Sequence, residues 1–153
     1  MGATFWSDID QSKIKENEFG SKLRSKGYKV TVVGYMETTP YDVAAINPKT
    51  NRTTTFEVKY DKMASKTGNI AVEYCKIRDE EESTPTGIST TQADYWVFSF
   101  PGDPTFYTVP TTTLKSLISE RKYMRTVSGG DNYWSRMYLF PKQTITSNAT
   151  QVK

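Results

Sequence analysis

The spacing of apolar and polar positions changes several times along the chain, and each change predicts an element. From residue 12 to about residue 26, Ile14, Phe19 and Leu23 recur among charged residues, which predicts an amphipathic helix that ends at Gly27. Short runs rich in β-branched and aromatic residues then predict strands, separated by turn-forming residues. The expected strands cover residues 28–36, 43–46, 56–60, 70–75, 95–100, 106–109 and 133–140, with further helices at 87–94 and 111–123.

The first predicted helix directs one carboxylate toward its apolar side. Four of its residues share a face at positions i, i+3, i+4 and i+7: Glu16, Phe19, Gly20 and Leu23. Glu16 therefore lies beside the apolar stripe, whereas Glu18 points elsewhere. An inward carboxylate needs a partner or a metal ion, because an unpaired buried charge is costly. The alternative is that Glu16 is a boundary residue whose carboxylate reaches water.

A predicted β-hairpin supplies two further acidic positions. The turn residues 47–51, Asn-Pro-Lys-Thr-Asn, separate two strand-like runs, and the hairpin brings Asp42 beside Glu57 and Lys59. Glu57 and Lys59 share one face, because side chains alternate along a strand. Two carboxylates and an ammonium would meet at a strand end, which suits a hard cation with a charge-stabilising partner. The alternative is a surface hairpin with an ordinary cross-strand ion pair.

The same residue types recur once more, at Asp103 and Glu120–Lys122. Leu114 and Leu117, just before this second glutamate, have helical spacing. Residues i and i+2 of a helix point to different faces, so Glu120 and Lys122 are not expected to converge. The copy on the hairpin, formed by Asp42, Glu57 and Lys59, is therefore the stronger candidate for a cation-binding site.

Composition narrows the available chemistry. The chain has 153 residues, which predicts one domain, with irregular ends expected at 1–12 and 146–153. The absence of histidine excludes histidine-based triads, histidine general bases and histidine zinc sites. The single cysteine excludes a disulfide framework and thiolate zinc sites. Catalysis must then rest on carboxylates, lysine, hydroxyl groups or a metal that prefers oxygen ligands, and Mg²⁺ or Mn²⁺ fit that description.

The charge and the lack of apolar runs indicate the kind of environment and partner. A net charge of +3 permits nucleic-acid binding without requiring it. We find no signal peptide and no apolar run long enough to span a bilayer, and the lone Cys75 suits a reducing compartment. We therefore expect a soluble, cytoplasmic protein that does not act at a membrane.

The pattern of Asp42 followed by Glu57-Val58-Lys59 resembles the motif of the PD-(D/E)xK nuclease superfamily. The opening also resembles archaeal-type Holliday-junction resolvases, whose first helix carries an acidic residue some three turns before a Gly-aromatic pair. Here that pair is Gly27-Tyr28, and counting back reaches Glu16. The later segments are similar to small phage nucleases of this superfamily. The resemblance implies an α/β fold with a restriction-endonuclease-like core, a mixed central β-sheet flanked by helices in the order αβββαβ.

The resemblance also implies a function, that of a metal-dependent endodeoxyribonuclease, with the resolution of branched DNA by a homodimer as one subclass. By analogy, Asp42, Glu57, the Val58 carbonyl and Glu16 would hold Mg²⁺ or Mn²⁺. Lys59 would position water and offset negative charge. Many members join the motif's proline directly to its aspartate, whereas here Tyr41 intervenes.

Further residues are weaker candidates for this chemistry. Glu73, on a predicted strand, and Gln92, before another, are possible additional site residues. The candidate DNA contacts, each also explicable as an ordinary surface or capping residue, are Lys13, Lys22, Lys26, Lys62, Lys66 and Thr90. The alternative to a nuclease is a non-enzymatic α/β protein that binds or assembles with a partner through its Thr- and Tyr-rich strands.

Overall fold

The computed structural model describes residues 2–33, 40–77, 82–129 and 134–153, with side chains described from residue 11 onward. Its helices are α1 (Gly2–Ser25), α2 (Ala64–Thr67), α3 (Thr111–Ser119) and α4 (Lys142–Thr146), together with the 3₁₀ turn η1 (Gly87–Ser89). Its strands are β1 (Lys29–Val32), β2 (Val43–Ile46), β3 (Thr53–Tyr60), β4 (Asn69–Ile77), β5 (Ser83–Pro85), β6 (Tyr95–Phe100), β7 (Asp103–Pro110), β8 (Arg125–Gly129), β9 (Trp134–Pro141) and β10 (Thr150–Val152).

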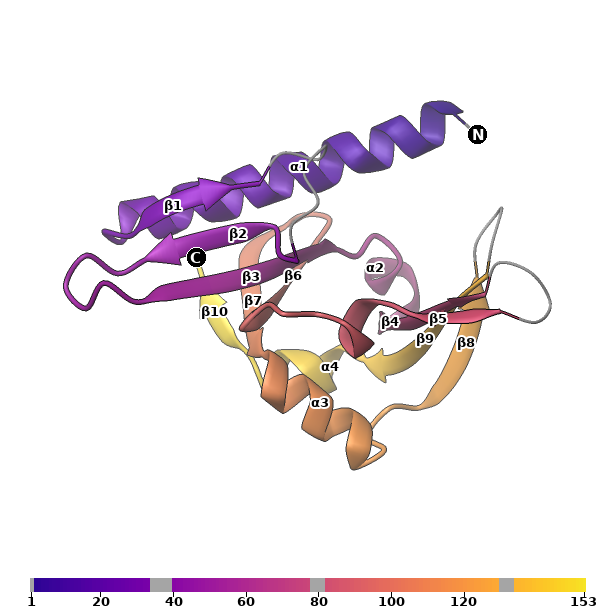
Figure 1. The fold of residues 1–153 in the computed structure, drawn as a ribbon. Helices are drawn as coiled ribbons and strands as arrows, with labels where there is room; N and C mark the ends of the chain where they lie inside the picture. Colours follow the sequence, from indigo (N-terminus) through magenta and orange to yellow (C-terminus); the bar gives the residue numbers. More distant parts are fainter. Residues whose placement is uncertain (1, 34–39, 78–81, 130–133) are drawn as a thin grey trace.

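The strands form two sheets. The central sheet has the order β1-β2-β3-β6-β7-β10, and within it β3 and β6 run parallel while the other described pairs are antiparallel. The second sheet is antiparallel, with the order β5-β4-β9-β8. In Figure 1, α1 runs along one side of the central sheet, and the second sheet lies toward the other side with α3 and α4. The predicted α/β class, with a mixed central sheet flanked by helices, is confirmed.

The predicted hairpin of β2 and β3 is present. The two strands pair antiparallel from Val43 opposite Phe56 to Ile46 opposite Thr53. Its turn is closed by the Asn47 amide, which donates to the Arg52 carbonyl at 2.9 Å. The Asn47 side chain in turn accepts from the Lys49 amide at 2.9 Å, a short-range bond that favours asparagine at turns. The register fixed by this turn aligns the two acidic strand ends.

Helix α1 packs on one face of the central sheet. Phe19 is fully buried, and its ring centre lies 5.0 Å from that of Phe56. Gly20 lets the helix approach β1 closely, because a methyl group there would lie 2.9 Å from a Val32 methyl carbon. Ile14 is 53% exposed, so its predicted place in the apolar stripe is wrong. Glu16, two residues later, is buried, because residues i and i+2 of a helix point to different sides.

The opposite face of the central sheet carries a second core. Trp96, Phe98 and Phe100 alternate along β6 and pack with Leu114 of α3 and Phe140 of β9. The intervening Val97 belongs to the core under α1. This alternation means that β6 is covered on both faces.

Some elements differ from their predictions. Residues 1–12, predicted as a polar lead-in, are helical from Gly2 onward, because extending a formed helix is far easier than nucleating one. Residues 146–153, predicted as a frayed tail, include β10, which pairs with β7 and gains a bond from Thr108 Oγ1 to the Thr150 carbonyl at 3.0 Å. The predicted helix at 87–94 is only the turn η1. Residues 34–36 of the first predicted strand lie outside the described residues.

A candidate acidic site at the end of the central sheet

Asp42 lies at one end of the central sheet, directly before β2. Its Oδ2 atom accepts a hydrogen bond from the Val58 amide at 2.8 Å. Its own amide donates to the Phe56 carbonyl at 2.9 Å. The Asp42 carbonyl accepts from the Val33 amide at 2.9 Å, just after β1. The aspartate is therefore held by the strands on both sides of it.

Glu57 and Lys59 share one face of β3, as strand alternation predicts. Glu57 is opposite Trp96 of β6, and the Lys59 Nζ atom lies 5.4 Å from the centre of the Trp96 ring. The Lys59 Nζ atom is 3.1 Å from Glu57 Oε2. The Glu57 side chain is 22% exposed and that of Lys59 is 45% exposed, so solvent reaches the lysine more easily than the glutamate.

Glu16 reaches the same region from α1. The residue is buried, and its Oε1 atom is 2.9 Å from Lys13 Nζ, one helical turn earlier. The Lys13 ammonium also donates a hydrogen bond to the Val33 carbonyl. By contrast, Glu18 is exposed and pairs with Lys15 at 3.1 Å. The predicted inward direction of Glu16 and outward direction of Glu18 are both confirmed.

The three carboxylates influence one another electrostatically. Burial raises the pKa of Glu16, and the charge of Glu57 raises it further, against the opposing pull of Lys13. Burial also raises the pKa of Asp42, with Glu16 adding to the rise while the Val58 amide opposes it. The pKa of Glu57 is raised by burial and by Asp42, although Lys59 works against the rise. The fold therefore places these three side chains within electrostatic range of one another.

Lys59 stays positively charged within this group. Partial burial works to lower the pKa of its ammonium, but Glu57, Asp42 and Glu73 outweigh that effect and raise the pKa overall. The site therefore combines three carboxylates that resist ionisation with an ammonium that resists deprotonation. That combination is suited to binding a further cation, because a divalent ion would relieve the repulsion among the acids.

Glu73 approaches the site from β4 of the second sheet. The pairing of β4 with β9 shifts register between Glu73 and Cys75, a β-bulge of the kind that redirects side chains. Gly87 of η1 packs against the strand here. A methyl group at this position would lie 2.1 Å from the Glu73 carbonyl oxygen, and Gly87 also has a φ of +55°. Glycine is therefore required beside Glu73.

Gln92 and Thr90 do not join the acidic site through any interaction seen among the described residues. Both are exposed, on the segment between η1 and β6. The neighbouring Asp94 instead accepts bonds from the amide and hydroxyl of Thr55, at 2.9 Å and 3.2 Å. The predicted helix that would have made Thr90 a phosphate-binding cap is absent, so that basis for its DNA contact is wrong.

The predicted DNA-contacting lysines fall into different places. Lys13 belongs to the acidic site itself. Lys22 lies farther along α1, with its ammonium 5.9 Å from the centre of the Phe106 ring. Lys62 and Lys66 are exposed just after β3, beside and on α2. Their roles in binding DNA stay predictions.

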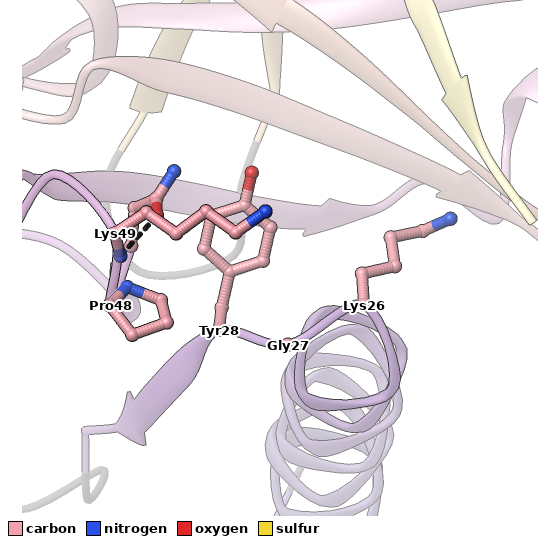
Figure 2. A pocket seen from close by; sticks show the side chains of 6 residues that line it. Lys26, Gly27, Tyr28, Pro48 and Lys49 are labelled. Atoms are coloured by element: carbon pink, nitrogen blue, oxygen red, sulfur yellow. Dashed lines mark hydrogen bonds between the residues drawn. The ribbon is translucent and has the colours of Figure 1, made fainter.

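Lys26 lines a pocket at the other end of α1. The pocket has a volume of about 270 Å³ and is formed by residues 26–28 and 47–49, where α1 turns into β1 beside the β2–β3 turn. Figure 2 shows the Lys49 side chain running across the Tyr28 ring, with Lys26 projecting from the end of the helix nearby. Gly27 makes the turn with a φ of +99°. Since α1 and β2 both run from the acidic site to this pocket, it marks the opposite end of the sheet.

The second copy of the motif has a different setting. The Asp103 carboxylate accepts bonds from the Thr105 amide at 2.9 Å and from the Tyr107 hydroxyl at 2.8 Å. Glu120 directly follows α3, and Arg121 has a φ of +56°. Helix α3 ends before the predicted bound of residue 123, so Glu120 and Lys122 lie in the turn after it and not on the helix that was predicted; neither lies on a strand.

Whether the acidic site suits a metal depends on its donor atoms. Among the described residues, no three acidic, histidine or cysteine side chains already stand in an arrangement that could hold a metal ion. Glu16 and Glu57 are each bound to a lysine, and Asp42 is bound to the Val58 amide. The donor chemistry nevertheless fits Mg²⁺ or Mn²⁺, because carboxylate oxygens are hard ligands, and the raised pKa values of these buried and half-buried groups show that they lack positive charge around them.

Lys13 has a place in the acidic site that the sequence did not predict, beside its predicted contact with DNA. Its ammonium bridges Glu16 and the Val33 carbonyl, so it is part of the site and not only a surface contact. The signal was its spacing of three residues from Glu16, which places both on one side of a helix. The bridge to Val33 had no comparable signal, because it joins residues 20 positions apart.

Comparison with known proteins supports the fold. No protein-family model matches the chain, and no curated protein matches it. Among solved structures, the chain is similar to a bacterial homing endonuclease, I-Ssp6803I, with a TM-score of 0.52 and 18% sequence identity. The similarity covers 69% of this chain and 70% of that one. At this level of identity the likeness shows a shared fold. Separately, no helix in the described part of the chain is both long and apolar enough to cross a membrane.

Proposed function

We propose that this protein is a divalent-metal-dependent endonuclease that hydrolyses DNA phosphodiester bonds. The observation that carries the proposal is the meeting of Glu16, Asp42 and Glu57 with Lys59 at one end of the central sheet. A surface hairpin with an ordinary ion pair would need neither the buried glutamate from α1 nor the raised pKa values. The structural likeness to a homing endonuclease supports the same reading.

The residues have distinct proposed roles. Asp42, Glu57 and Glu16, with the Val58 carbonyl, would hold Mg²⁺ or Mn²⁺. The metal would supply a Lewis acid that polarises the scissile phosphate and stabilises charge on the leaving oxygen. Asp42 is already oriented for this role, because the Val58 amide fixes one of its oxygens and leaves the other unclaimed by that bond.

Lys59 would act on the attacking water and on the charge of the phosphate. Its ammonium is held beside Glu57 and over Trp96, yet nearly half of its side chain remains accessible to solvent. An accessible, permanently charged donor can orient a water molecule by a hydrogen bond. It can also stabilise the extra negative charge that develops on the phosphate oxygens in the transition state. The charge of Glu73, on the second sheet, would help to keep the pKa of this ammonium high.

The test is a nicking assay on closed circular plasmid with millimolar Mg²⁺ or Mn²⁺. We expect conversion to open circles, which also distinguishes an endonuclease from an enzyme that needs ends. Asp42→Asn and Lys59→Met should each abolish most of this conversion. Lys115→Met is the matched control, because Lys115 is an exposed lysine on α3. Intact plasmid under all metal conditions, or full activity in both site variants, would refute the proposal in favour of a non-enzymatic binding or assembly protein.

The preferred DNA structure is a finer proposal. We propose branched DNA, such as a four-way junction, on the strength of the resemblance of residues 16–28 to resolvases. Resolution requires two matched cuts, so this version also proposes a homodimer, since two-fold symmetry pairs two sites. Equal cutting of junctions and linear duplex of the same sequence would remove the branched-DNA proposal. Light scattering of the purified protein, alone and with a junction, tests the dimer.

A further inference from the structure

Two lysines, not one, neutralise the acidic site. Lys59 pairs with Glu57 on β3, and Lys13 pairs with Glu16 on α1. The Lys13 side chain is 24% exposed, and its partner's side chain is 9% exposed. The charge of Lys13 also reaches Asp42 and favours the ionised form of that carboxyl. Lys13 therefore acts on two of the three acids, although the nuclease motif itself contains no residue at its position.

We propose that Lys13 is a built-in counter-ion that occupies the Glu16 end of the site in the metal-free protein and must leave Glu16 when a divalent cation binds. The inference rests on the proposed metal-dependent function. It assigns Lys13 a positioning role: it holds Glu16 ready and competes with the metal for it.

The competition follows from the geometry of one oxygen atom. Lys13 Nζ is 2.9 Å from Glu16 Oε1, which is the distance of a direct charge-assisted hydrogen bond. Mg²⁺ binds carboxylate oxygens at about 2.0–2.1 Å, much closer than an ammonium does. An ammonium and such an ion on the same carboxylate would repel each other strongly in a partly buried site. Lys13 therefore has to yield when Glu16 becomes a ligand.

Lys13 has a second partner that makes such a move possible. The Val33 carbonyl accepts a hydrogen bond from the same ammonium, at the point where the chain leaves β1. When Lys13 releases Glu16, it keeps this backbone acceptor and need not be left unpaired in a buried place. The same bond ties α1 to β1 beside Asp42, whose carbonyl accepts from the Val33 amide.

The chain contains a matched control for this pair. Lys15 and Glu18 form an ion pair with the same spacing on the same helix, at 3.1 Å. Glu18 has a 48% exposed side chain, and this pair contacts none of the three acids. Lys13→Met and Lys15→Met therefore remove the same charge and the same kind of helical ion pair. They differ in whether the acidic site is involved.

The experiment measures Mn²⁺ binding to DNA-free protein by calorimetry at about pH 8, where carboxylates are ionised. We expect Lys13→Met to bind Mn²⁺ about fivefold or more tightly than wild type, because a competing charge is gone. Lys15→Met should match wild type. In metal-free buffer, Lys13→Met should lower the melting temperature by about 4–8 °C, because Glu16 loses its counter-ion, whereas Lys15→Met should change it by less than about 2 °C.

A second variant keeps the proposal testable if Lys13→Met does not fold. Lys13→Arg retains the charge and can clamp the Glu16 carboxylate with two parallel hydrogen bonds, so it should weaken Mn²⁺ binding relative to wild type. Unchanged or opposite affinities in these variants would overturn the counter-ion role, even if wild type binds Mn²⁺ and nicks plasmid. If neither wild type nor variants take up Mn²⁺, the proposed metal-dependent function is lost together with this inference.

Discussion

Replacing Asp42 by asparagine should stabilise the metal-free protein while destroying its proposed activity. The asparagine oxygen can still accept the Val58 amide, so the hydrogen bond of 2.8 Å is kept. What disappears is a carboxylate whose pKa is raised chiefly by burial and further by Glu16. The substitution also removes the favourable attraction of the Asp42 carboxylate to Lys59 and Lys13. The net change in the free energy of unfolding is the difference between these two effects.

We expect a net gain of about 1 kcal/mol, within the range of about 0.5–2 kcal/mol that is typical of single stabilising substitutions. For a chain of 153 residues this corresponds to a rise of about 2–4 °C in melting temperature. The sign depends on pH. A carboxyl with a raised folded-state pKa favours folding while it is protonated, and this contribution is lost as pH rises from the ordinary aspartate range through the folded-state pKa. The advantage of Asp42→Asn should therefore vanish near about pH 4 and grow as pH rises toward about pH 8.

The assay is differential scanning fluorimetry or calorimetry across this pH range, with a chelator present. Asp94→Asn is the matched control, because Asp94 also accepts a β3 amide, that of Thr55 at 2.9 Å, but is exposed and outside the acidic site. It should show no gain at about pH 8. Adding Mn²⁺ should raise the melting temperature of wild type more than that of Asp42→Asn. A variant that melts at or below the wild-type temperature at about pH 8 without metal would contradict the electrostatic reasoning.

Three further predictions concern catalysis, packing and DNA contact. Lys59→Met should slow plasmid nicking by about 10²–10³-fold, because its ammonium is needed in the transition state. Its urea midpoint should fall modestly, because Glu57 loses its counter-ion; retained nicking in the folded variant would remove the role of Lys59. Gly87→Ala should cost about 2–4 kcal/mol in urea unfolding, because the new methyl group would lie 2.1 Å from the Glu73 carbonyl; a wild-type midpoint would contradict the packing. Lys26→Glu should weaken duplex binding in fluorescence anisotropy and reduce the slope of log affinity against log salt by about one or more, whereas an unchanged slope would exclude a phosphate contact in the Lys26 pocket.

The elements that could be predicted from the sequence are those with a strong local signal. The hairpin was readable because a turn cluster separates two β-rich runs, and its register then placed Asp42 near Glu57. Helical spacing identified Glu16 as inward before any partner was known. The bounds predicted for strand 95–100 match β6, because its apolar residues alternate between two cores: Trp96, Phe98 and Phe100 face one, and Val97 faces the other.

The missing parts depend on distant partners. Strand β10 has a polar sequence, and what makes it a strand is its pairing with β7, about forty residues earlier in the chain. The helix expected after Gly87 is replaced by a turn, because this glycine is pressed against the Glu73 backbone. Ile14 suggested a wider apolar stripe, yet the sheet covers only the side of α1 that holds Phe19. Neither pairing nor coverage can be read from local spacing.

The parallel pairing of β3 with β6 has a consequence for how the protein folds. The four principal groups of the acidic site lie within residues 16–59, on α1 and the β2–β3 hairpin, whose contacts are largely local and can form early. Strand β3 nevertheless needs β6 as its second neighbour, and the chain passes through β4 and β5 before β6 is reached. During synthesis β3 would present an open edge until β6 has emerged, which makes this stage the most exposed to aggregation. We expect the pairing of β3 with β6 to limit the rate of folding. The acidic residues of the site would then emerge early in synthesis, but they would be held rigidly only after β6 has paired.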